Sequence, residues 1–433
     1  MKILFVALDS WRKDNSLGNS YSSVFGKMED VEIAHVFSSN KKPDYEKNVT
    51  RYFQIEEEAV IKTVFSSIDR EGVGREVTLD DFEEPNHSAN KGKKNFYSKA
   101  LSFGKKHHWI LLYWARDLAW RFGRINYDGL IGFVKDFNPD LIFFSFGNIF
   151  RSNRLAFYLK ELTGVPMVVH MQMDHYTLKR FSYSPFFWID KFLKRRIIRR
   201  LAKKTDLFYC ISERLKNELE ASLHVPCKVL YKIPDSGRSF EPYKKIHKPI
   251  RFLFTGNIGA NRWKTLSMLA KSLQKLQFGN LDIYTSNPIT KEIENSLNIE
   301  GYSSTHGPVS QSEVIRLQNE ADVLVHVEAF DLRNRLLVRG AISTKIMDYL
   351  SIGRSILAIG PEDIDSMAFL KEGDVAMMAH SKNDLIDILN KIKNDNTILF
   401  DYAQRGVNQI HKHYDADTMR MNLYNELKLL IDK

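Results

Sequence analysis

The stretch AISTKIMDYLSIGRSILAIGP (341–361) places side chains that can bind an anion close to one that can bind a diol. Ser343, Thr344 and Lys345 open a short helical pattern, and the first turn of a helix offers unpaired N–H groups and partial positive charge to a phosphate. Asp348 follows Thr344 by four residues, which puts its carboxylate on the same helix face, roughly 6 Å further along the axis. This spacing predicts a site for a diphosphate and the ribose attached to it.

An ordinary helix cap explains the same hydroxyl residues, because serine and threonine are preferred at helix N-termini whatever the helix binds. A second stretch, TGNIGANRWKTL (255–266), favours the anion site. Gly256 and Gly259 let a ligand approach the backbone, and Arg262 and Lys264 supply positive charge where a helix begins. One glycine turn is usually just a connection, but two such turns, each with a cation, favour a phosphate site.

Both stretches lie among short apolar runs separated by amphipathic segments. The runs are continuous rather than alternating, which is typical of strands buried on both faces of a parallel sheet. Ligands of such sheets bind beyond the carboxyl ends of the strands. We therefore predict an α/β protein with two doubly wound, Rossmann-like parallel sheets that face a cleft. The predicted strands are 2–8, 31–37, 140–147, 166–172, 206–212 and 228–232 in the first sheet, and 250–256, 281–286, 322–328, 355–360 and 375–380 in the second.

A charged stretch with three prolines at 233–249 separates the two groups of runs and is interpreted as a linker. The polar stretch 38–106 has no clear pattern and is interpreted as an insertion or mobile loop. The resulting domains are an N-terminal domain over 1–235, a linker over 236–249, a second domain over 250–405, and C-terminal helices over 406–433 that pack back toward the N-terminal domain.

The composition fits a large globular protein with an anionic partner. Its 433 residues exceed the usual size of one core, and 43% hydrophobic residues can bury a substantial interior. No apolar run approaches the roughly 18 residues that a membrane-spanning helix requires. A formal net charge of +10 favours a nucleotide, a phospholipid or a nucleic acid without choosing among them. Cys210 and Cys227 lack metal-ligand spacing and are interpreted as buried thiols in a reducing compartment.

Four segments resemble motifs of GT-B glycosyltransferases, in particular of the retaining, family 4-like group that uses nucleotide-activated sugars. In chain order they are TDLFYCISERLKNEL, TGNIGANRWKTL, HGPVSQSEVIRLQNEADVLVHV and STKIMDYLSIGRSILAIGP. The resemblance covers most of 140–430, and its most specific motifs lie between 250 and 360. It implies that the second domain binds the donor and that the N-terminal domain lies on the acceptor side.

The resemblance implies a donor site built from both candidate stretches and from further loops. The implied donor-binding residues are Gly256, Asn257, Arg262, His306, Gly307, Glu328, Ser343, Thr344, Lys345 and Asp348. Gly256, Arg262 and the 343–345 segment would contact the diphosphate, and Asp348 would accept the ribose hydroxyls. The loop at 306–309 would face the base.

Two departures from the family pattern concern the donor. Relatives usually carry glutamate where this chain has Asp348, whose shorter side chain must approach the ribose more closely or act through water. Many relatives carry another glutamate eight positions earlier, which contacts the donor sugar, and this position is Gly340 here. Glu328, at the end of a predicted strand, is a candidate substitute, and a surface charge at a strand end is the alternative.

Catalysis in the retaining group needs no protein nucleophile, because cations and helix dipoles stabilise the leaving diphosphate. Arg262 and Lys345 would neutralise that charge, so neither a metal nor another cofactor is expected. The Asp-x-Asp spacings at 363–365 and 415–417 do not follow strands as metal-binding pairs do, and are interpreted as solvated charges. His170 matches a histidine that faces the donor sugar in relatives, and a structural role is the alternative.

Two features concern the acceptor side. Gly18 and Asn19 follow the first predicted strand, where relatives have a glycine turn that faces the acceptor. The segment 186–204 contains eight Lys or Arg residues, and a basic amphipathic helix of this kind binds anionic membrane surfaces. The alternative is a helix whose apolar stripe packs on the sheet while its charges face water. The stripe consists of Ile189, Phe192, Leu193, Ile197 and Leu201.

These features predict a cytoplasmic glycosyltransferase, peripheral on the inner face of the membrane, that uses a nucleotide-diphosphate sugar. Its acceptor would be a lipid-linked or growing surface polysaccharide, and transfer would occur with retention. A non-catalytic nucleotide-sugar-binding subunit, motivated by Gly340, and an inverting GT-B enzyme are the alternatives. Nucleic-acid binding is not expected, because basic and aromatic residues do not interleave along a sheet as in single-strand binders.

Overall fold

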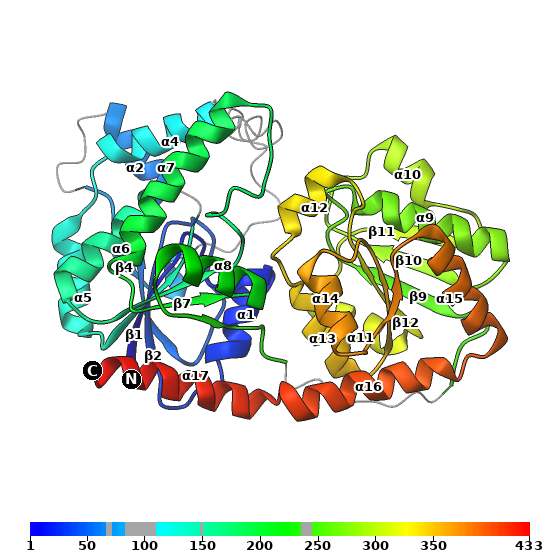
Figure 1. Ribbon diagram of the computed structural model, residues 1–433. Helices are drawn as coiled ribbons and strands as arrows, with labels where there is room; N and C mark the ends of the chain where they lie inside the picture. Colours follow the sequence, from blue (N-terminus) through cyan, green and yellow to red (C-terminus); the bar gives the residue numbers. More distant parts are fainter. Residues whose placement is uncertain (66–71, 83–109, 148–149, 235–244) are drawn as a thin grey trace. The chain divides into compact units, whose positions relative to one another are not determined.

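The computed structural model describes residues 1–65, 72–82, 110–147, 150–234 and 245–433, which form two compact units. Unit 1 comprises Met1–Leu230 and Asn422–Lys433, and unit 2 comprises Tyr231–Met421. Figure 1 shows that each unit has its own sheet with helices on both faces. The predicted α/β fold with two parallel-dominated, doubly wound sheets is confirmed.

The sheet of unit 1 contains eight strands. They are β1 (Lys2–Val6), β2 (Glu32–Phe37), β3 (Val49–Gln54), β4 (Arg75–Val77), β5 (Leu141–Ser145), β6 (Met167–Met171), β7 (Leu207–Cys210) and β8 (Cys227–Val229). Their order is β4-β3-β2-β1-β5-β6-β7-β8, and only the pairing of β3 with β4 is antiparallel. Every residue of β5 and β6 is buried, because helices cover both faces.

The two faces of this sheet have different cores. One face packs on helices through a mixed aliphatic and aromatic core that includes Leu130, Phe133 and Leu159. The other is aromatic, with the rings of Phe5 and Phe143 stacked at 5.6 Å between centroids. Cys210 and Cys227 are buried free thiols, as predicted. The helices of unit 1 are α1 (Ser16–Phe25), α2 (Glu57–Phe65), the 3-10 turn η1 (Leu79–Asp81), α4 (Ile110–Phe122), α5 (Tyr127–Phe137), α6 (Phe150–Thr163), α7 (Pro185–Ala202) and α8 (Glu213–Leu223).

The last helix of the chain, α17 (Ala416–Ile431), begins in unit 2 and ends in unit 1. In unit 1 its Glu426 accepts a hydrogen bond of 2.5 Å from the Tyr209 hydroxyl. The same carboxylate forms an ion pair with Lys228 Nζ at 2.7 Å. These contacts attach the end of the chain to β7 and β8.

The sheet of unit 2 contains six parallel strands. They are β9 (Arg251–Thr255), β10 (Asn280–Tyr284), β11 (Ser303–His306), β12 (Val323–Val327), β13 (Ser355–Ile359) and β14 (Met377–Ala379). The order is β11-β10-β9-β12-β13-β14. The chain thus builds outward from β9 in one direction and then from β12 in the other, which is the dinucleotide-binding type of doubly wound sheet.

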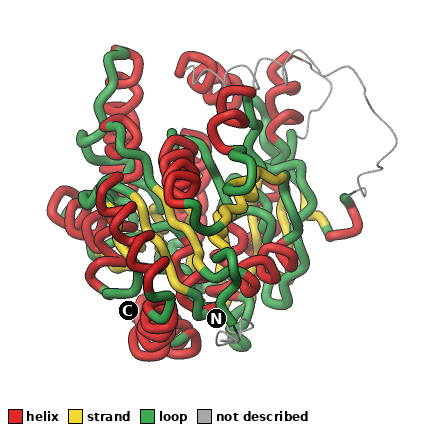
Figure 2. Tube along the Cα trace, turned by 90° about the vertical axis from the view of Figure 1, so that its right-hand side faces the viewer, coloured by secondary structure: helices red, strands yellow, loops and turns green. Residues whose placement is uncertain are grey.

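Helices cover both faces of this second sheet, and Figure 2 shows strands in layers between helices. One core packs helices α9, α10 and α15 against the sheet, and the other packs α11, α13 and α14. The helices are α9 (Arg262–Leu276), α10 (Lys291–Leu297), α11 (Gln311–Glu320), α12 (Leu332–Val338), α13 (Thr344–Ile352), α14 (Asp365–Glu372), α15 (Lys382–Asn394) and α16 (Ile398–His413).

The structure contains strands that the sequence patterns did not predict. β3 and β4 lie within 38–106, so the interpretation of this stretch as an insertion or loop is wrong for its described part. β11 was also missed. β4 and β11 lie at sheet edges, where polar side chains are common and apolar runs are short. Residues 236–244 of the predicted linker, and 66–71 and 83–106 of the polar stretch, lie outside the described residues.

Candidate functional site

The candidate donor site lies at the point where the strand order of unit 2 reverses. β9 and β12 are neighbours in the sheet, and Gly256 and Glu328 directly follow their carboxyl ends. Parallel α/β sheets bind ligands at this position, because the connections on either side diverge to opposite faces. The topology of the sheet therefore places two predicted donor-binding residues, Gly256 and Glu328, close to each other.

Gly256 makes room for the amine of Lys345. Its φ of +149° is one that side chains rarely adopt, and a Cβ atom built there would lie 1.4 Å from Lys345 Nζ. The lysine belongs to the first turn of α13, and its Nζ also lies 5.3 Å from the centroid of the Phe254 ring. Burial, followed by the charge of Arg262, lowers the pKa of Lys345 from 10.5 to about 8. The surroundings of the Lys345 amine therefore favour its charged form only weakly.

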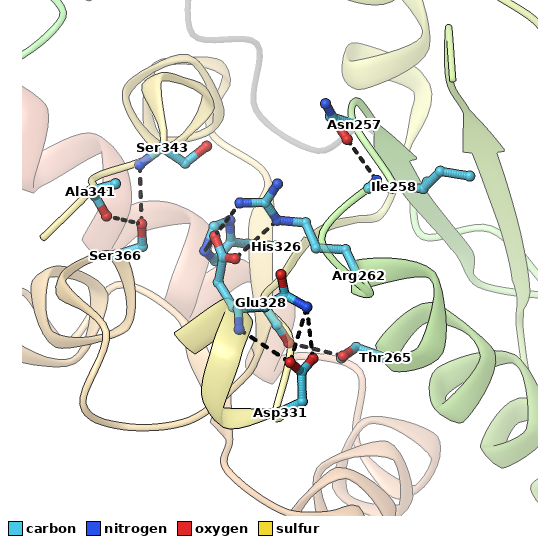
Figure 3. A network of polar contacts seen from close by, with 12 residues as sticks. Asn257, Ile258, Arg262, Thr265, His326, Glu328, Asp331, Ala341, Ser343 and Ser366 are labelled. Atoms are coloured by element: carbon cyan, nitrogen blue, oxygen red, sulfur yellow. Dashed lines mark hydrogen bonds and ion pairs between the residues drawn. The ribbon is translucent and has the colours of Figure 1, made fainter. Parts of the chain in front are cut away.

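Arg262 begins α9 and reaches across to the end of β12. Its Nε and Nη2 donate to the two carboxylate oxygens of Glu328 at 2.9 and 3.1 Å, as Figure 3 shows. The Thr265 hydroxyl donates to the backbone oxygen of Glu328 at 2.9 Å, so α9 holds both ends of this residue. Burial raises the pKa of Glu328, although Arg262 opposes the shift. Glu328 is thus buried and paired, and the surface-charge alternative is wrong.

His326 is part of the same cluster, and the sequence reasoning missed it. It lies in β12 beside the Arg262–Glu328 pair, with Nε2 3.8 Å from a Glu328 oxygen (Figure 3). The side chain is buried, and Nε2 has no hydrogen-bond partner among the described residues. Burial, followed by the charges of Arg262 and Lys345, lowers its pKa to about 3, so the ring is neutral at pH 7. A histidine within the apolar run VLVHV was the available signal.

The N-terminus of α13 lacks the side-chain cap that serine normally provides. Ser343 occupies the N-cap position, but its side chain makes no capping hydrogen bond in the described part of the chain. Ser366 of α14 instead holds the preceding loop, because its hydroxyl accepts from the Ser343 amide at 3.1 Å and donates to the Ala341 carbonyl at 2.9 Å. The ordinary-cap interpretation is therefore wrong at Ser343. Thr344 and Lys345 form the first turn of a helix whose N–H groups suit an anion.

Asp348 lies one turn further along α13 and forms a buried ion pair. Both of its carboxylate oxygens accept from Lys232 Nζ, at 2.6 and 2.7 Å. The two side chains are 5% (Lys232) and 10% (Asp348) exposed. Lys232 follows β8 at the start of unit 2, 116 residues away in sequence, and no sequence pattern linked it to Asp348.

The loop between β9 and α9 is strained. Ala260 and Asn261 both have positive φ angles, of 53° and 61°, which are unfavourable for residues with a Cβ atom. The Asn261 side chain donates to Asp331 at 3.0 Å, which fixes this conformation. Asn257, a predicted donor-binding residue, is exposed on the same loop, and its side-chain oxygen accepts from the Gly259 amide at 2.6 Å. The conformation of this loop determines the position at which α9 begins with Arg262.

His306 and Gly307 lie at the carboxyl end of β11, two strands from β9. The His306 ring stacks on Tyr284 at 4.4 Å between centroids, and its Nε2 lies 2.8 Å from Asp282. A Cβ atom on Gly307 would meet nothing within 4 Å, so local packing does not require glycine there. The stacked pair is a flat surface at the same edge of the sheet as Gly256.

In unit 1, His170 belongs to a buried polar cluster at the ends of β5 and β6. Its Nδ1 lies 3.0 Å from the Tyr21 hydroxyl, which donates to Ser145 at 2.8 Å and accepts from Gln172 at 2.8 Å. His170 Nε2 is buried without a partner among the described residues. Burial lowers the pKa of His170 to about 3, so the imidazole is neutral at pH 7.

Gly18 and Asn19 do not lie in a loop, which corrects the sequence prediction. Both belong to α1, whose N-cap residue Asn15 accepts from the Gly18 amide at 2.7 Å. A Cβ atom on Gly18 would lie 2.0 Å from the carbonyl oxygen of Arg12. The glycine therefore allows the loop after β1 to pack against the helix.

The two Asp-x-Asp spacings bind partners within the protein. Asp363 pairs with Arg335 at 2.7 Å, and Asp417 with Arg420 at 2.9 Å. Asp365 is buried, so the interpretation of both spacings as solvated charges is wrong for this residue. Among the residues that the structure describes, no group of three or more His, Cys, Asp or Glu side chains could hold a metal ion.

No family model matches the sequence, and no curated protein matches it either. Solved structures match over nearly the whole chain. Sucrose-phosphate synthase from Thermosynechococcus elongatus is 9% identical with a TM-score of 0.63, covering 100% of this chain and 99% of that chain. HepE from Anabaena, in complex with UDP and glucose, is 12% identical with a TM-score of 0.62 and covers 99% of both chains. TarM from S. aureus is 11% identical with a TM-score of 0.51, covering 72% of this chain and 59% of that chain. At these identities the likeness shows the fold alone, which is the GT-B fold.

Proposed function

We propose that the protein is a glycosyltransferase whose donor is a nucleotide-diphosphate sugar. One observation carries the proposal: Lys345, Arg262 and the uncapped N-terminus of α13 lie together at the switch point of unit 2. The two side chains are close enough for the charge of Arg262 to lower the pKa of Lys345. Two cations and a helix N-terminus at one edge of a sheet are suited to a diphosphate.

In the proposed reaction, the bond from the anomeric carbon to the diphosphate breaks and a bond to an acceptor hydroxyl forms. Arg262 and Lys345 stabilise the negative charge that develops on the leaving diphosphate. With retention, an oxygen of the leaving diphosphate takes the acceptor proton, and no protein nucleophile or metal is required. An NMR measurement of the anomeric configuration of the product distinguishes retention from inversion.

The remaining donor-site residues receive roles from their positions. Glu328 would meet the donor sugar, since Arg262 holds its carboxylate beside the diphosphate-binding cations. Asp348 would accept ribose hydroxyls and share its carboxylate with Lys232. The stacked rings of Tyr284 and His306 would support the base. HepE structures in complex with UDP and with UDP-glucose make UDP-sugars the first donors to test.

The acceptor side of the proposal concerns unit 1. A lipid-linked or growing surface glycan is the proposed acceptor, and Gly18 and Asn19 are the candidate residues on this side. His170, which also belongs to unit 1, is the candidate for contacting the transferred sugar. Because His170 is neutral at pH 7, its proposed role is to hydrogen-bond a sugar hydroxyl through Nε2 rather than to exchange protons. A cytoplasmic location, peripheral to the membrane, is part of the same proposal.

The deciding experiment is a titration of ligands against the protein and its variants by calorimetry. The ligands are UDP, other nucleoside diphosphates, their sugars, and the free nucleosides. R262A and K345A should each weaken diphosphate binding about tenfold or more, because a charge-assisted contact contributes about 1.5–3 kcal/mol. Their affinity for free nucleosides should barely change. The matched control is K275A, which removes an exposed cation from the last turn of α9. An equal loss for nucleoside and diphosphate would contradict the phosphate assignment.

A non-catalytic nucleotide-sugar-binding subunit is the second candidate, because Gly340 stands where relatives carry a carboxylate. The two functions differ in turnover. An active enzyme slowly transfers sugar to water, so UDP should accumulate from a UDP-sugar in the absence of acceptor. A protein that binds the donor but releases no UDP above the R262A level would favour the binding subunit.

A further inference from the structure

A group of large apolar side chains is exposed at the beginning of α7 and in the loop before it. We call this group the apolar tip. The tip consists of Phe181, Tyr183, Phe186, Ile189, Phe192 and Leu193. Tyr183 is 94% exposed, Phe181 57% and Phe192 56%. Exposed apolar groups of this size on a folded protein commonly mark an interaction surface.

Ring contacts make the tip continuous. Phe181 lies 4.9 Å from Tyr183 and 6.2 Å from Trp188 between ring centroids, and Trp188 lies 6.5 Å from Phe192. Ile189 lies three and four residues before Phe192 and Leu193, so these side chains are neighbours on the helix surface. The tip is therefore one surface built from the loop and two turns of helix.

The two halves of α7 differ, which corrects the expectation that its stripe packs on the sheet. In the second half, Leu201 of the stripe and the neighbouring Ile198 are fully buried in the core of unit 1, and Ile197 of the stripe is half-buried. Ile189, Phe192 and Leu193, in the first half, are exposed. Figure 1 shows the first turns of α7 extending away from the sheet of unit 1. The stripe is thus continuous in sequence but has two different surroundings.

Positive charge follows the tip along the same helix face. Arg196 and Arg200 are exposed and lie seven and eleven residues after Ile189, which keeps them on its face. At 1.5 Å per residue, they lie roughly 10 and 16 Å along the axis from it. Arg195 and Arg199 instead bind Tyr176, through its carbonyl at 2.6 Å and its hydroxyl at 3.0 Å, respectively.

Acidic side chains are nearly absent from this region. The segment 173–204 contains ten Lys or Arg residues and two Asp residues, counted from the sequence. Asp174 is buried and accepts from the amides of Tyr176 and Thr177. Asp190 accepts from Trp114 and pairs with Lys194. The surface therefore presents apolar rings and cations, with both carboxylates occupied.

We propose that the apolar tip inserts into the interface of an anionic lipid bilayer, with Arg196 and Arg200 at the level of the lipid headgroups. Aromatic and aliphatic side chains bordered by cations are the composition of interfacial membrane anchors. A uniformly anionic surface matches a region without available carboxylates better than a protein surface of mixed charge does. Among the described residues, no helix combines the length and apolarity needed to cross a bilayer.

The experiment measures sedimentation of the full-length protein with vesicles of phosphatidylcholine, with or without about 30% phosphatidylglycerol. A tip variant carries F181S, Y183S and F192S, and a charge variant carries R196Q and R200Q. The control variant removes one exposed apolar and two exposed cationic side chains elsewhere in unit 1, by L429S, K62Q and K135Q. All substituted side chains are exposed, and circular dichroism with thermal unfolding checks that each variant is folded.

The wild type and the control variant should bind anionic vesicles alike and bind neutral vesicles weakly. The charge variant should bind about thirtyfold less tightly, at about 1 kcal/mol per basic residue. The affinity of the tip variant for anionic vesicles should fall at least about tenfold, because it has lost three rings whose transfer from water into the bilayer would favour binding. Wild-type binding should also weaken between 0.1 and 1 M salt, as the screening length falls from about 10 to about 3 Å.

Two outcomes would overturn the proposal. The first is a wild type that does not bind anionic vesicles, or a tip variant that binds them as well as the control does. The second is concentration-dependent self-association that the tip variant abolishes without any vesicle binding, which would assign the tip to a second copy of the chain. No sugar donor is present in this assay, so its result is independent of the proposed glycosyltransferase activity.

Discussion

At the scale of single residues, Lys345 lies where a positive charge is weakly supported in the free protein. Burial and the nearby Arg262 lower its pKa to about 8, so a measurable fraction is neutral in mildly alkaline solution. A bound diphosphate favours the protonated amine and raises this pKa. Binding and protonation of Lys345 are therefore linked, and the sign of the linkage can be measured.

We expect the affinity for nucleoside diphosphates to be greatest below pH 8 and to fall as the pH rises through 8. The complex then has to take up a proton that the free protein has lost, and the loss approaches about tenfold per pH unit. Calorimetric titrations between pH 7 and 9.5 measure this slope. K345R retains its charge over the whole range and should show a flatter profile. An equally steep profile for K345R would assign the pH dependence to another group.

At the scale of elements, the site depends on three connections that each use a particular backbone conformation. Gly256, directly after β9, has a positive φ angle, and so do Ala260 and Asn261, directly before α9. The loop before α13 is held by Ser366 rather than by a cap of its own. Arg262 and Lys345 therefore reach the same edge of the sheet because their helices begin where these connections place them.

G256A should both destabilise the protein and weaken diphosphate binding. The backbone conformation is strained for alanine, at a cost of about 1–3 kcal/mol, and the new methyl group would displace the Lys345 amine. Melting temperature and UDP affinity measure the two effects, and we expect UDP binding about tenfold weaker. G301A is the matched control, because this glycine also has a positive φ, of +76°, but its Cβ atom would meet nothing within 4 Å. It should lower the melting temperature through backbone strain and leave UDP affinity unchanged. Unchanged UDP affinity in G256A would show that the amine does not need its present position.

At the scale of the whole molecule, the chain forms two units, and its last helix begins in one and ends in the other. The end of α17 is attached to unit 1 through Glu426, which binds Tyr209 of β7 and Lys228 of β8. The Tyr209 side chain is buried, and the proximity of Glu426 adds to the burial that raises its pKa. Its hydroxyl depends on this carboxylate as an acceptor.

E426A should lower the free energy of unfolding of unit 1 by about 1–3 kcal/mol, because a buried hydroxyl loses its acceptor. Urea denaturation followed by circular dichroism measures the loss. UDP affinity should be unchanged, since the proposed diphosphate site belongs to unit 2. D432A removes an exposed carboxylate directly after the same helix and should leave both quantities unchanged. Weaker UDP binding in E426A would contradict this separation of the two units.

Local patterns were sufficient for some features and not for others. Continuous apolar runs predicted most strands of both sheets, but β3 and the short edge strands β4 and β11 escaped because polar residues interrupt them. Serine at the start of α13 left an ordinary cap as the alternative to an anion site, but the Ser343 side chain makes no capping hydrogen bond in the described part of the chain, and Ser366 holds only the preceding loop. Helical periodicity predicted the apolar stripe of α7, but which half is covered depends on the elements packed around it.

The sequence by itself determined that Gly256, Arg262 and the 343–345 segment would lie near strand ends of one parallel sheet, because parallel strands direct their carboxyl ends to the same edge. Only the tertiary structure decided which side chains meet there. Lys345 lies against Gly256, Arg262 binds Glu328, neutral His326 lies beside them, and Asp348 binds Lys232. These pairs join residues that are far apart in the chain, and packing of helices on the sheet sets their distances. Spacing within a single segment carries no information about them.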